Sequence, residues 1–290
     1  MDATSRIERS LERALSFATV GDRPPLLCKA VHHAVFSDGA RVRPRLCLAV
    51  AEACGDPYRE ASTAAATAIE LLHCASLVHD DLPCFDNSDL RRGKPSVHAA
   101  FGEPLALLAG DALIILSFET LARECAVTPH RLAPLIATVA RSVGMPNGIV
   151  AGQAWESEVE IDVEEYHRTK TASLFMGATA AGAIAADSDP QPWIEVGKQL
   201  GAAYQVADDL RDMVGSAQEI GKPCRQDAAN NQPNIAGELG ISGSVARLQE
   251  FVSNAIDAVP DVPGSDSLRN LIHGEVKRLM PRKLLSKSAA

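Results

Sequence analysis

Two acidic stretches, far apart along the chain, contain the residues whose types and spacing could do chemistry. The first is LVHDDLPCFD at residues 77–86, followed by RRG at 91–93, and the second is YQVADDLRD at 204–212. In each, a pair of aspartates lies at the end of, or inside, an otherwise apolar helical pattern. Carboxylates on a buried face are costly unless positive charge meets them, and neither pair has enough nearby lysine. Hard cations with oxygen ligands would supply that charge.

Helical spacing predicts that the second stretch presents one polar face. Gln205, Asp208, Asp209 and Asp212 stand at i, i+3, i+4 and i+7, which lie on the same side of a helix. A simpler interpretation is helix capping with solvated charge, but a cap needs one acid rather than a stripe.

The first stretch predicts a helix that ends within the motif. His73, Ser76 and Asp80 share a face by the same spacing, and Pro83 ends the helix. Asp86 must therefore return from a loop to join Asp80.

Two carboxylate clusters facing each other across a cavity suit a polyphosphate held through several Mg²⁺ ions. Mg²⁺ prefers a few carboxylates, several waters and substrate phosphate oxygens. Arg91 and Arg92 follow the first cluster and could hold the remaining phosphate oxygens, since arginine makes bidentate contacts to phosphate.

The elements that position these residues are predicted to be helices. Hydrophobic residues make up 46% of the 290 residues but aromatics only 4%, which favours close-packed helices over a β-sandwich. No repeat and no linker divides the chain, so we expect one domain over residues 1–290. The expected helices cover residues 5–18, 24–36, 41–54, 61–81, 105–121, 130–143, 174–186, 190–214, 241–258 and 266–280.

Several segments carry more specific expectations. The apolar run 105–121 predicts a core helix, and the acidic residues from Glu156 to Glu165 predict a solvated face. Residues 221–234 are long and polar enough for a lid. Three arginines within residues 41–45, at a helix start, fit either a solvated surface patch or an anion site.

Charge and cysteine content exclude some classes of function. A formal charge of −9 argues against nucleic acid as the main partner. Seven scattered cysteines without metal spacing indicate free thiols in a reducing cytoplasm. The N-terminus predicts an amphipathic helix rather than a signal peptide, and the apolar run 174–186 is too short to cross a bilayer. We expect a soluble cytoplasmic protein without a membrane span.

The two motifs, in this order, resemble those of the trans-isoprenyl diphosphate synthases, and within that family the bacterial geranylgeranyl type of carotenoid biosynthesis. The likeness extends from residues 39–44 to Gly221-Lys222. It implies an all-α isoprenoid synthase fold, a single large bundle of about ten or more helices around a central cavity. It also implies a homodimer, three Mg²⁺ ions, and head-to-tail addition of isopentenyl diphosphate to allylic diphosphates of C5 to C15.

The resemblance also assigns roles to residues. It implies Mg²⁺ binding, some of it through water, by Asp80, Asp81, Asp86, Asp208, Asp209 and Asp212. Of these, Asp80, Asp81, Asp86 and Asp208 are expected to be catalytic together with Lys170. The allylic diphosphate would be held by Arg91, Lys170, Thr171, Gln205 and Lys222. Isopentenyl diphosphate would be held by Arg43, His73 and Arg92.

Product length can be argued from size. The growing tail should run down the helix below Asp80, where Ala75 and Ser76 are small and where farnesyl-type relatives often place an aromatic residue. We therefore expect a C20 product. The alternative is that another helix supplies a floor for the tail, which would give a C15 product.

Two positions depart from the family pattern. Ala40 and Gln232 stand where lysines are usual, which should weaken substrate binding unless Arg41, Arg45 or Arg225 replaces them.

Three rival interpretations remain open at this point. A non-catalytic partner subunit of a prenyl synthase would have degraded motifs. A class I terpene cyclase usually mixes Asn, Ser or Thr with Glu in its second metal site. A metal phosphohydrolase built on His79-Asp80 would draw on His32, His33 and His73.

Overall fold

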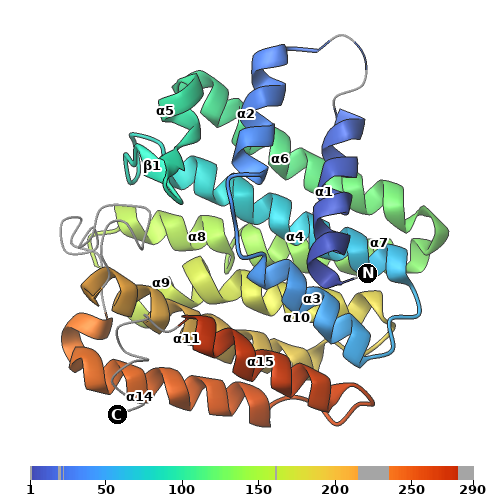
Figure 1. Cartoon of the computed structure of the whole chain (residues 1–290), viewed down its shortest axis with the longest axis vertical. Helices are drawn as coiled ribbons and strands as arrows, with labels where there is room; N and C mark the ends of the chain where they lie inside the picture. The colour runs from blue at the N-terminus through green and yellow to red at the C-terminus, as the bar shows by residue number, and fades with distance from the viewer. Residues whose placement is uncertain (1, 19–20, 22, 161, 215–234, 280–290) are drawn as a thin grey trace.

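The computed structural model describes residues 2–18, 21, 23–160, 162–214 and 235–279. These residues form a bundle of helices with one small hairpin (Figure 1). In chain order the elements are α1 (Ala3–Ala18), α2 (Pro25–Val35), α3 (Val42–Ala53), α4 (Arg59–Asp80), β1 (Leu90–Arg91), β2 (Lys94–Pro95), α5 (Val97–Phe101), α6 (Glu103–Glu124), η1 (Cys125–Val127), α7 (Pro129–Val143), α8 (Ile149–Ala154), η2 (Trp155–Ser157), α9 (Val163–His167), η3 (Arg168–Ala172), α10 (Ser173–Ala185), α11 (Gln191–Val214), α14 (Ile235–Asp257) and α15 (Ser265–Leu279).

The centre of the bundle is formed by α4 and α10. Helix α4 packs against α3, α6 and α10, while α10 also packs against α7 and α11. Both helices are rich in alanine and are buried over most of their length, so backbones can approach closely. At Gly182 a Cβ atom would lie 2.3 Å from the carbonyl oxygen of Cys47 on α3. Small residues therefore set the spacing of the helices that carry the acidic motifs.

The first acidic motif folds back as expected after α4. The helix ends at Asp80, and the backbone N–H of Asp86 donates to the carbonyl oxygen of Asp80 at 3.0 Å. The N–H of Ser88 donates to the carbonyl of Asp81 at 3.1 Å. These bonds confirm the predicted return of Asp86 to the end of the helix.

The basic turn after this motif is a two-strand hairpin. Arg91 pairs with Lys94 in antiparallel register, and the two turn residues have left-handed backbones, with φ 54° at Arg92 and 76° at Gly93. Such tight hairpins favour glycine at the turn. The turn separates the two arginines: Arg91 lies on the strand, and Arg92 lies at the tip.

A π-helical turn interrupts the chain before α10. Segment η3 spans Arg168–Ala172 and holds Lys170 and Thr171. Wide turns of this kind are often found at functional sites.

Most predicted helices are present, with ends shifted by a few residues. The helix expected at 241–258 extends upstream in α14, which is broken by non-helical backbone at Gly240. The expected lid at 221–234 lies entirely outside the described residues. The expectation that residues 105–121 form a core helix is only half right, because Leu107, Leu108 and Ile115 on α6 are 50%, 50% and 68% exposed.

By length and composition alone, two helical stretches in the described part of the chain could cross a membrane. They are α4 and residues 103–127, with 78% and 44% of their apolar windows buried inside the molecule. This is weak support for a span, since the core helix of a soluble protein has the same composition.

Candidate active site

The two acidic motifs meet at a cavity of about 390 Å³. Its walls come from α3, α4, the hairpin, α8, α9, η3 and α11. The lining residues are Arg43, His73, Ser76, Leu77, Asp80, Asp86, Arg91, Arg92, Ile149, Gln153, Tyr166, Lys170, Thr171, Tyr204, Gln205, Asp208 and Arg211. Residues distant in sequence thus converge on one space, as the two motifs predicted.

The two aspartates at the end of α4 differ in their surroundings. Asp80 lines the cavity, whereas Asp81 is 2% exposed and bound by Arg91, whose Nε donates to Oδ1 at 2.9 Å. Burial raises the pKa of Asp81, although the Arg91 charge opposes this. The first pair is therefore partly neutralised by an arginine, whereas only lysine and metal ions were considered for that role from the sequence. Asp81 as a direct metal ligand remains a prediction.

The second motif places one acid on the cavity wall. Asp208 lines the cavity, while Asp209 and Asp212 are buried and are not among the lining residues. Gln205 connects neighbouring elements: its Oε1 accepts from the Thr171 hydroxyl at 2.6 Å, and its Nε2 donates to Asp209 Oδ1 at 2.8 Å. Thr171 and Gln205, both expected near the allylic diphosphate, are thus in contact.

Lys170 extends from η3 into the cavity between two carboxylates. Its Nζ is 3.5 Å from Asp80 Oδ1 and also forms an ion pair with Glu156. Burial alone would lower the pKa of its ammonium, but the charges of Asp80 and Glu156 contribute to raising it above the ordinary value. Lys170 is therefore a fixed positive charge beside the first motif.

Arg43 and His73 form a buried pair. The guanidinium of Arg43 lies 4.5 Å from the centre of the Phe175 ring and 5.3 Å from that of Tyr204. Burial, reinforced by Arg43, holds the pKa of His73 well below its usual range. The imidazole is thus neutral at pH 7, and its Nε2 can accept from Arg43 Nη1 at 3.3 Å. The Nε of Arg43 is buried and has no hydrogen-bond partner among the described residues.

The neighbouring arginines do not replace the missing lysine at position 40. Arg41 is 5% exposed and donates from Nη1 to Glu70 at 2.6 Å and from Nε to Glu8 at 2.8 Å. Arg45 pairs with Glu275 at 2.8 Å. Neither lines the cavity, so the three arginines are not one patch: Arg43 alone among them reaches the site. Arg225, Lys222 and Gln232 lie outside the described residues.

Sequence reasoning missed several cavity residues. Glu156 was expected on a solvated face, but its side chain is 18% exposed and contacts Lys170; that expectation was wrong. Gln153 and Tyr166 line the same wall. Tyr204 and Arg211 could have been found, because they share a helix face with Asp208 at i−4 and i+3.

The two residues expected to set product length lie differently. Ser76 lines the cavity, whereas Ala75 is 2% exposed and belongs to the apolar core. Neither residue places a bulky side chain in the cavity, as predicted. The C20 product remains a prediction.

The donor set fits the predicted magnesium. In the part of the chain that the structure describes, Oδ1 of Asp80 is buried without a hydrogen-bond partner, and Asp86 and Asp208 line the same cavity. Within the described residues, no three His, Cys, Asp or Glu side chains form a cluster that could hold a metal by themselves. Sparse protein carboxylates match Mg²⁺, which completes its shell with water and phosphate oxygens.

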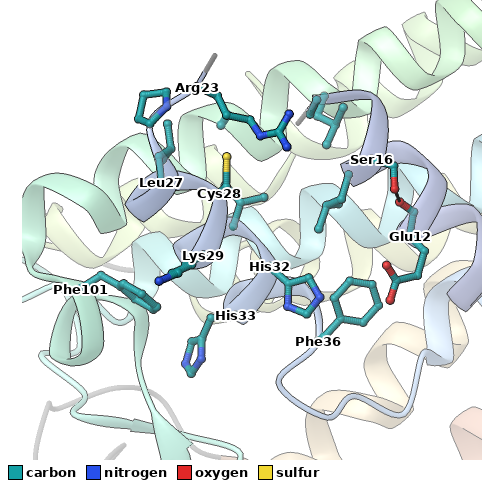
Figure 2. A pocket seen from close by; sticks show the side chains of 16 residues that line it. Glu12, Ser16, Arg23, Leu27, Cys28, Lys29, His32, His33, Phe36 and Phe101 are labelled. Atoms are coloured by element: carbon teal, nitrogen blue, oxygen red, sulfur yellow. Dashed lines mark hydrogen bonds between the residues drawn. The ribbon is translucent and has the colours of Figure 1, made fainter. Parts of the chain in front are cut away.

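Two of the three histidines on which the phosphohydrolase interpretation would draw lie away from Asp80, whereas His73 lines the same cavity as Asp80. His32 and His33 line a separate cavity of about 750 Å³ between α1, α2 and α6, as Figure 2 shows. His79 packs on α6, where a Cβ at Gly110 would lie 2.0 Å from its Nε2. His32, His33 and His79 therefore do not join Asp80 in a metal centre.

An all-α bundle with opposed aspartate clusters and cationic side chains around one cavity defines a class of enzymes acting on diphosphates. Comparison with known proteins identifies the family: the polyprenyl synthetase model matches residues 24–257, and the chain belongs to that family. This confirms the predicted family, fold class and type of enzyme.

Three similar proteins add detail. The chain is 48% identical to the geranylgeranyl diphosphate synthase of Rhodobacter capsulatus, over 97% of each chain. It is 46% identical to that of Cereibacter sphaeroides, over 97% of this chain and 98% of the relative. A geranyltransferase from Helicobacter pylori, solved with magnesium and isoprenyl diphosphate, superposes with a TM-score of 0.79 at 28% identity, over 96% of this chain and 98% of that one.

Proposed function

We propose that this protein joins isopentenyl diphosphate to allylic diphosphates of C5 to C15 and releases geranylgeranyl diphosphate. The observation that carries the proposal is the convergence of Asp80, Asp86 and Asp208 with Lys170 and Arg43 on one cavity. The names of the bacterial relatives support the C20 product.

In this proposal the allylic diphosphate lies between the aspartates and Lys170. Asp80, Asp86 and Asp208 would hold Mg²⁺, three ions by family resemblance, and the metal would supply charge that stabilises the departing diphosphate. Lys170 and Arg91 add fixed positive charge, and Thr171 and Gln205 orient the same group. Asp209 accepts from Gln205 at 2.8 Å, and Mg²⁺ binding by Asp81, Asp209 and Asp212 remains a prediction from the family resemblance.

The chemistry is one substitution followed by one proton loss. The bond between the allylic carbon and the diphosphate oxygen breaks, and the electron pair leaves with diphosphate. The double bond of isopentenyl diphosphate then forms the new carbon–carbon bond, and the proton lost afterwards goes to the released diphosphate. Leu77 and Ile149 give apolar wall area that keeps water from the allylic cation.

Isopentenyl diphosphate is proposed to bind beside Arg43, His73 and Arg92. Arg43 has an unsatisfied buried Nε and a neutral histidine that orients its Nη1, so its donors are set for an anion. Bidentate arginine contacts to phosphate would compensate for the alanine at position 40.

The protein is further proposed to act as a homodimer of single-domain chains. The support is the exposed apolar side of α6, formed by Leu107, Leu108 and Ile115. Patches of this kind on one helix face mark protein interfaces. A cytoplasmic location and supply of carotenoid or related isoprenoid biosynthesis complete the proposal.

A product assay tests the function. Purified protein, Mg²⁺ and labelled isopentenyl diphosphate are incubated with C5, C10 or C15 allylic diphosphate, and the dephosphorylated products are sized by mass. A C20 alcohol is expected. A C15 alcohol would retain the chemistry but identify a farnesyl-type enzyme, and a folded protein without elongation would favour the partner-subunit interpretation.

A further inference from the structure

The carboxylate of Glu156 is a meeting point for three side chains of the cavity wall. It lies in η2, directly after α8, and its Oε1 accepts from the Tyr166 hydroxyl at 2.7 Å and from the ammonium of Lys170. Its Oε2 accepts from Gln153 Nε2 at 2.6 Å. Both oxygens are thus used, which fixes the plane of the carboxylate.

Lys170 depends on this carboxylate for its position. A lysine side chain carries a compact charge on a flexible four-carbon stem, so the position of its ammonium group depends on the groups that bind it. Its other anionic neighbour, Asp80 at 3.5 Å, is the residue proposed to bind metal. Glu156 therefore differs from Asp80, because both of its oxygens accept hydrogen bonds from side chains of the protein.

Backbone packing fixes the same geometry. Helix α8 and the π-helical turn η3 touch at Gly152, where a Cβ would lie 2.3 Å from the backbone nitrogen of Lys170 and 2.4 Å from its Cα. Glu156 follows four residues later, and Lys170 leaves the widened turn toward it. The acid and the lysine are thus held on two segments in direct contact.

We propose that Glu156 is a positioning residue for the allylic diphosphate, acting through Lys170. One N–H of the ammonium donates to Glu156, and the remaining donors are directed into the cavity, where the diphosphate binds. This inference rests on the role proposed above for Lys170.

Electrostatics alone predicts the opposite effect. Glu156 is an anion close to the site of another anion, so removing its charge should strengthen diphosphate binding if only charge mattered. If Glu156 orients Lys170, removing its charge should weaken binding instead. The sign of the change distinguishes the two.

The experiment is calorimetric titration of dimethylallyl diphosphate into the protein with Mg²⁺ and without isopentenyl diphosphate. Glu156→Gln keeps the shape of the side chain, and we expect it to raise Kd roughly tenfold, the effect of one charge-assisted hydrogen bond. Lys170→Gln should raise Kd at least as much, and the double variant should match Lys170→Gln. The matched control is Glu165→Gln, whose partner is Arg168 outside the cavity, with an unchanged Kd expected.

An unchanged or lower Kd for Glu156→Gln would overturn the inference, as would a further loss when it is added to Lys170→Gln. A normal Kd for Lys170→Gln would instead overturn the role of Lys170 itself, which separates failure of the proposed site from failure of the inference. If Glu156→Gln does not fold, Gln153→Ala removes the hydrogen bond to Oε2 and keeps Glu156 itself. It should raise Kd roughly threefold, and only when Lys170 is present.

Discussion

At the scale of residues, identical side chains in the site have different environments. Asp80 lines the cavity with its Oδ1 3.5 Å from Lys170 Nζ, whereas the adjacent Asp81 is buried against Arg91. Asp208 faces the cavity, and Asp209 is bound by Gln205. Each motif therefore places at least one acid on the cavity wall and has another acid bound by a neighbouring side chain.

The acids on the cavity wall should be indispensable to turnover. We expect Asp80→Ala or Asp208→Ala to lower kcat by about a thousandfold or more, since each removes charge stabilisation of the leaving diphosphate. Steady-state kinetics measures the loss, and circular dichroism checks that the helices persist. Near-normal activity in either folded variant would refute the metal assignment.

His73 should make stability sensitive to acid. Its pKa is lowered in the folded protein, so between its ordinary value of 6.5 and the lower folded value the unfolded chain binds a proton that the folded chain does not. Stability should therefore fall as pH decreases below 6.5, by about 1.4 kcal/mol per pH unit at most from this group. Urea denaturation at pH 7.5 and 5.5 measures the free energy of unfolding, and its difference between the two pH values should be smaller in His73→Gln than in the natural protein. Equal differences in the two proteins would refute the role of His73.

Ser76 and Ala75 should control product length. Ser76→Phe places a ring directly in the cavity, and Ala75→Phe pushes on the same wall from the core side. Both should shift the product from C20 toward C15, whereas Ser76→Ala should leave it at C20. Mass analysis of the alcohols decides, and a C20 product from Ser76→Phe would place the floor on another helix.

At the scale of elements, the contact between α8 and η3 leaves no room for a side chain at Gly152. We expect Gly152→Ala to cost about 1–3 kcal/mol of stability, because its Cβ would meet backbone atoms of Lys170 that cannot move aside alone. The Km for the allylic substrate should rise as well. Thermal denaturation and kinetics provide the measurements.

Gly274→Ala is the matched control for that substitution. Outside its own helix backbone and chain neighbours, no atom of the described residues lies within 4 Å of a Cβ placed there, and the residue is exposed inside α15. Alanine should stabilise the helix by about 0.5–1 kcal/mol. Destabilisation by both substitutions would show that crowding at Gly152 is not the cause.

Sequence patterns predicted those parts of the site that depend on local spacing. The stripe of Gln205 and Asp208 and the return of Asp86 follow from helix periodicity and a proline. Glu156 was missed because its contact with Lys170 arises from packing of α8 against η3, which no local pattern encodes. Arg41 and Arg43 could not be told apart either: the left-handed backbone at Arg41, with φ 50°, and its buried acid partners come from tertiary structure.

At the scale of the whole molecule, the exposed side of α6 should mediate association. Ile115→Glu places a charge in the centre of that apolar face and should convert a dimer into monomers. Light scattering with size-exclusion chromatography measures the mass. Val159→Glu, at a fully exposed valine away from α6, is the control and should not change it. A monomeric natural protein would refute the proposed assembly.

The position of the cavity has a consequence for the lifetime of the protein in the cell. Asp80 and Asp86 come from the N-terminal half of the chain, and Asp208 from α11 in the C-terminal half (Figure 1). Like charges across a gap repel, and a cation–diphosphate complex between them turns that repulsion into a bridge joining the halves. At a hundredfold excess over Kd, such a bridge adds about 2.7 kcal/mol to the free energy of unfolding. When the substrate is scarce, a larger fraction of the protein would be unfolded and open to proteolysis. The abundance of the protein would then follow the supply of its own substrate.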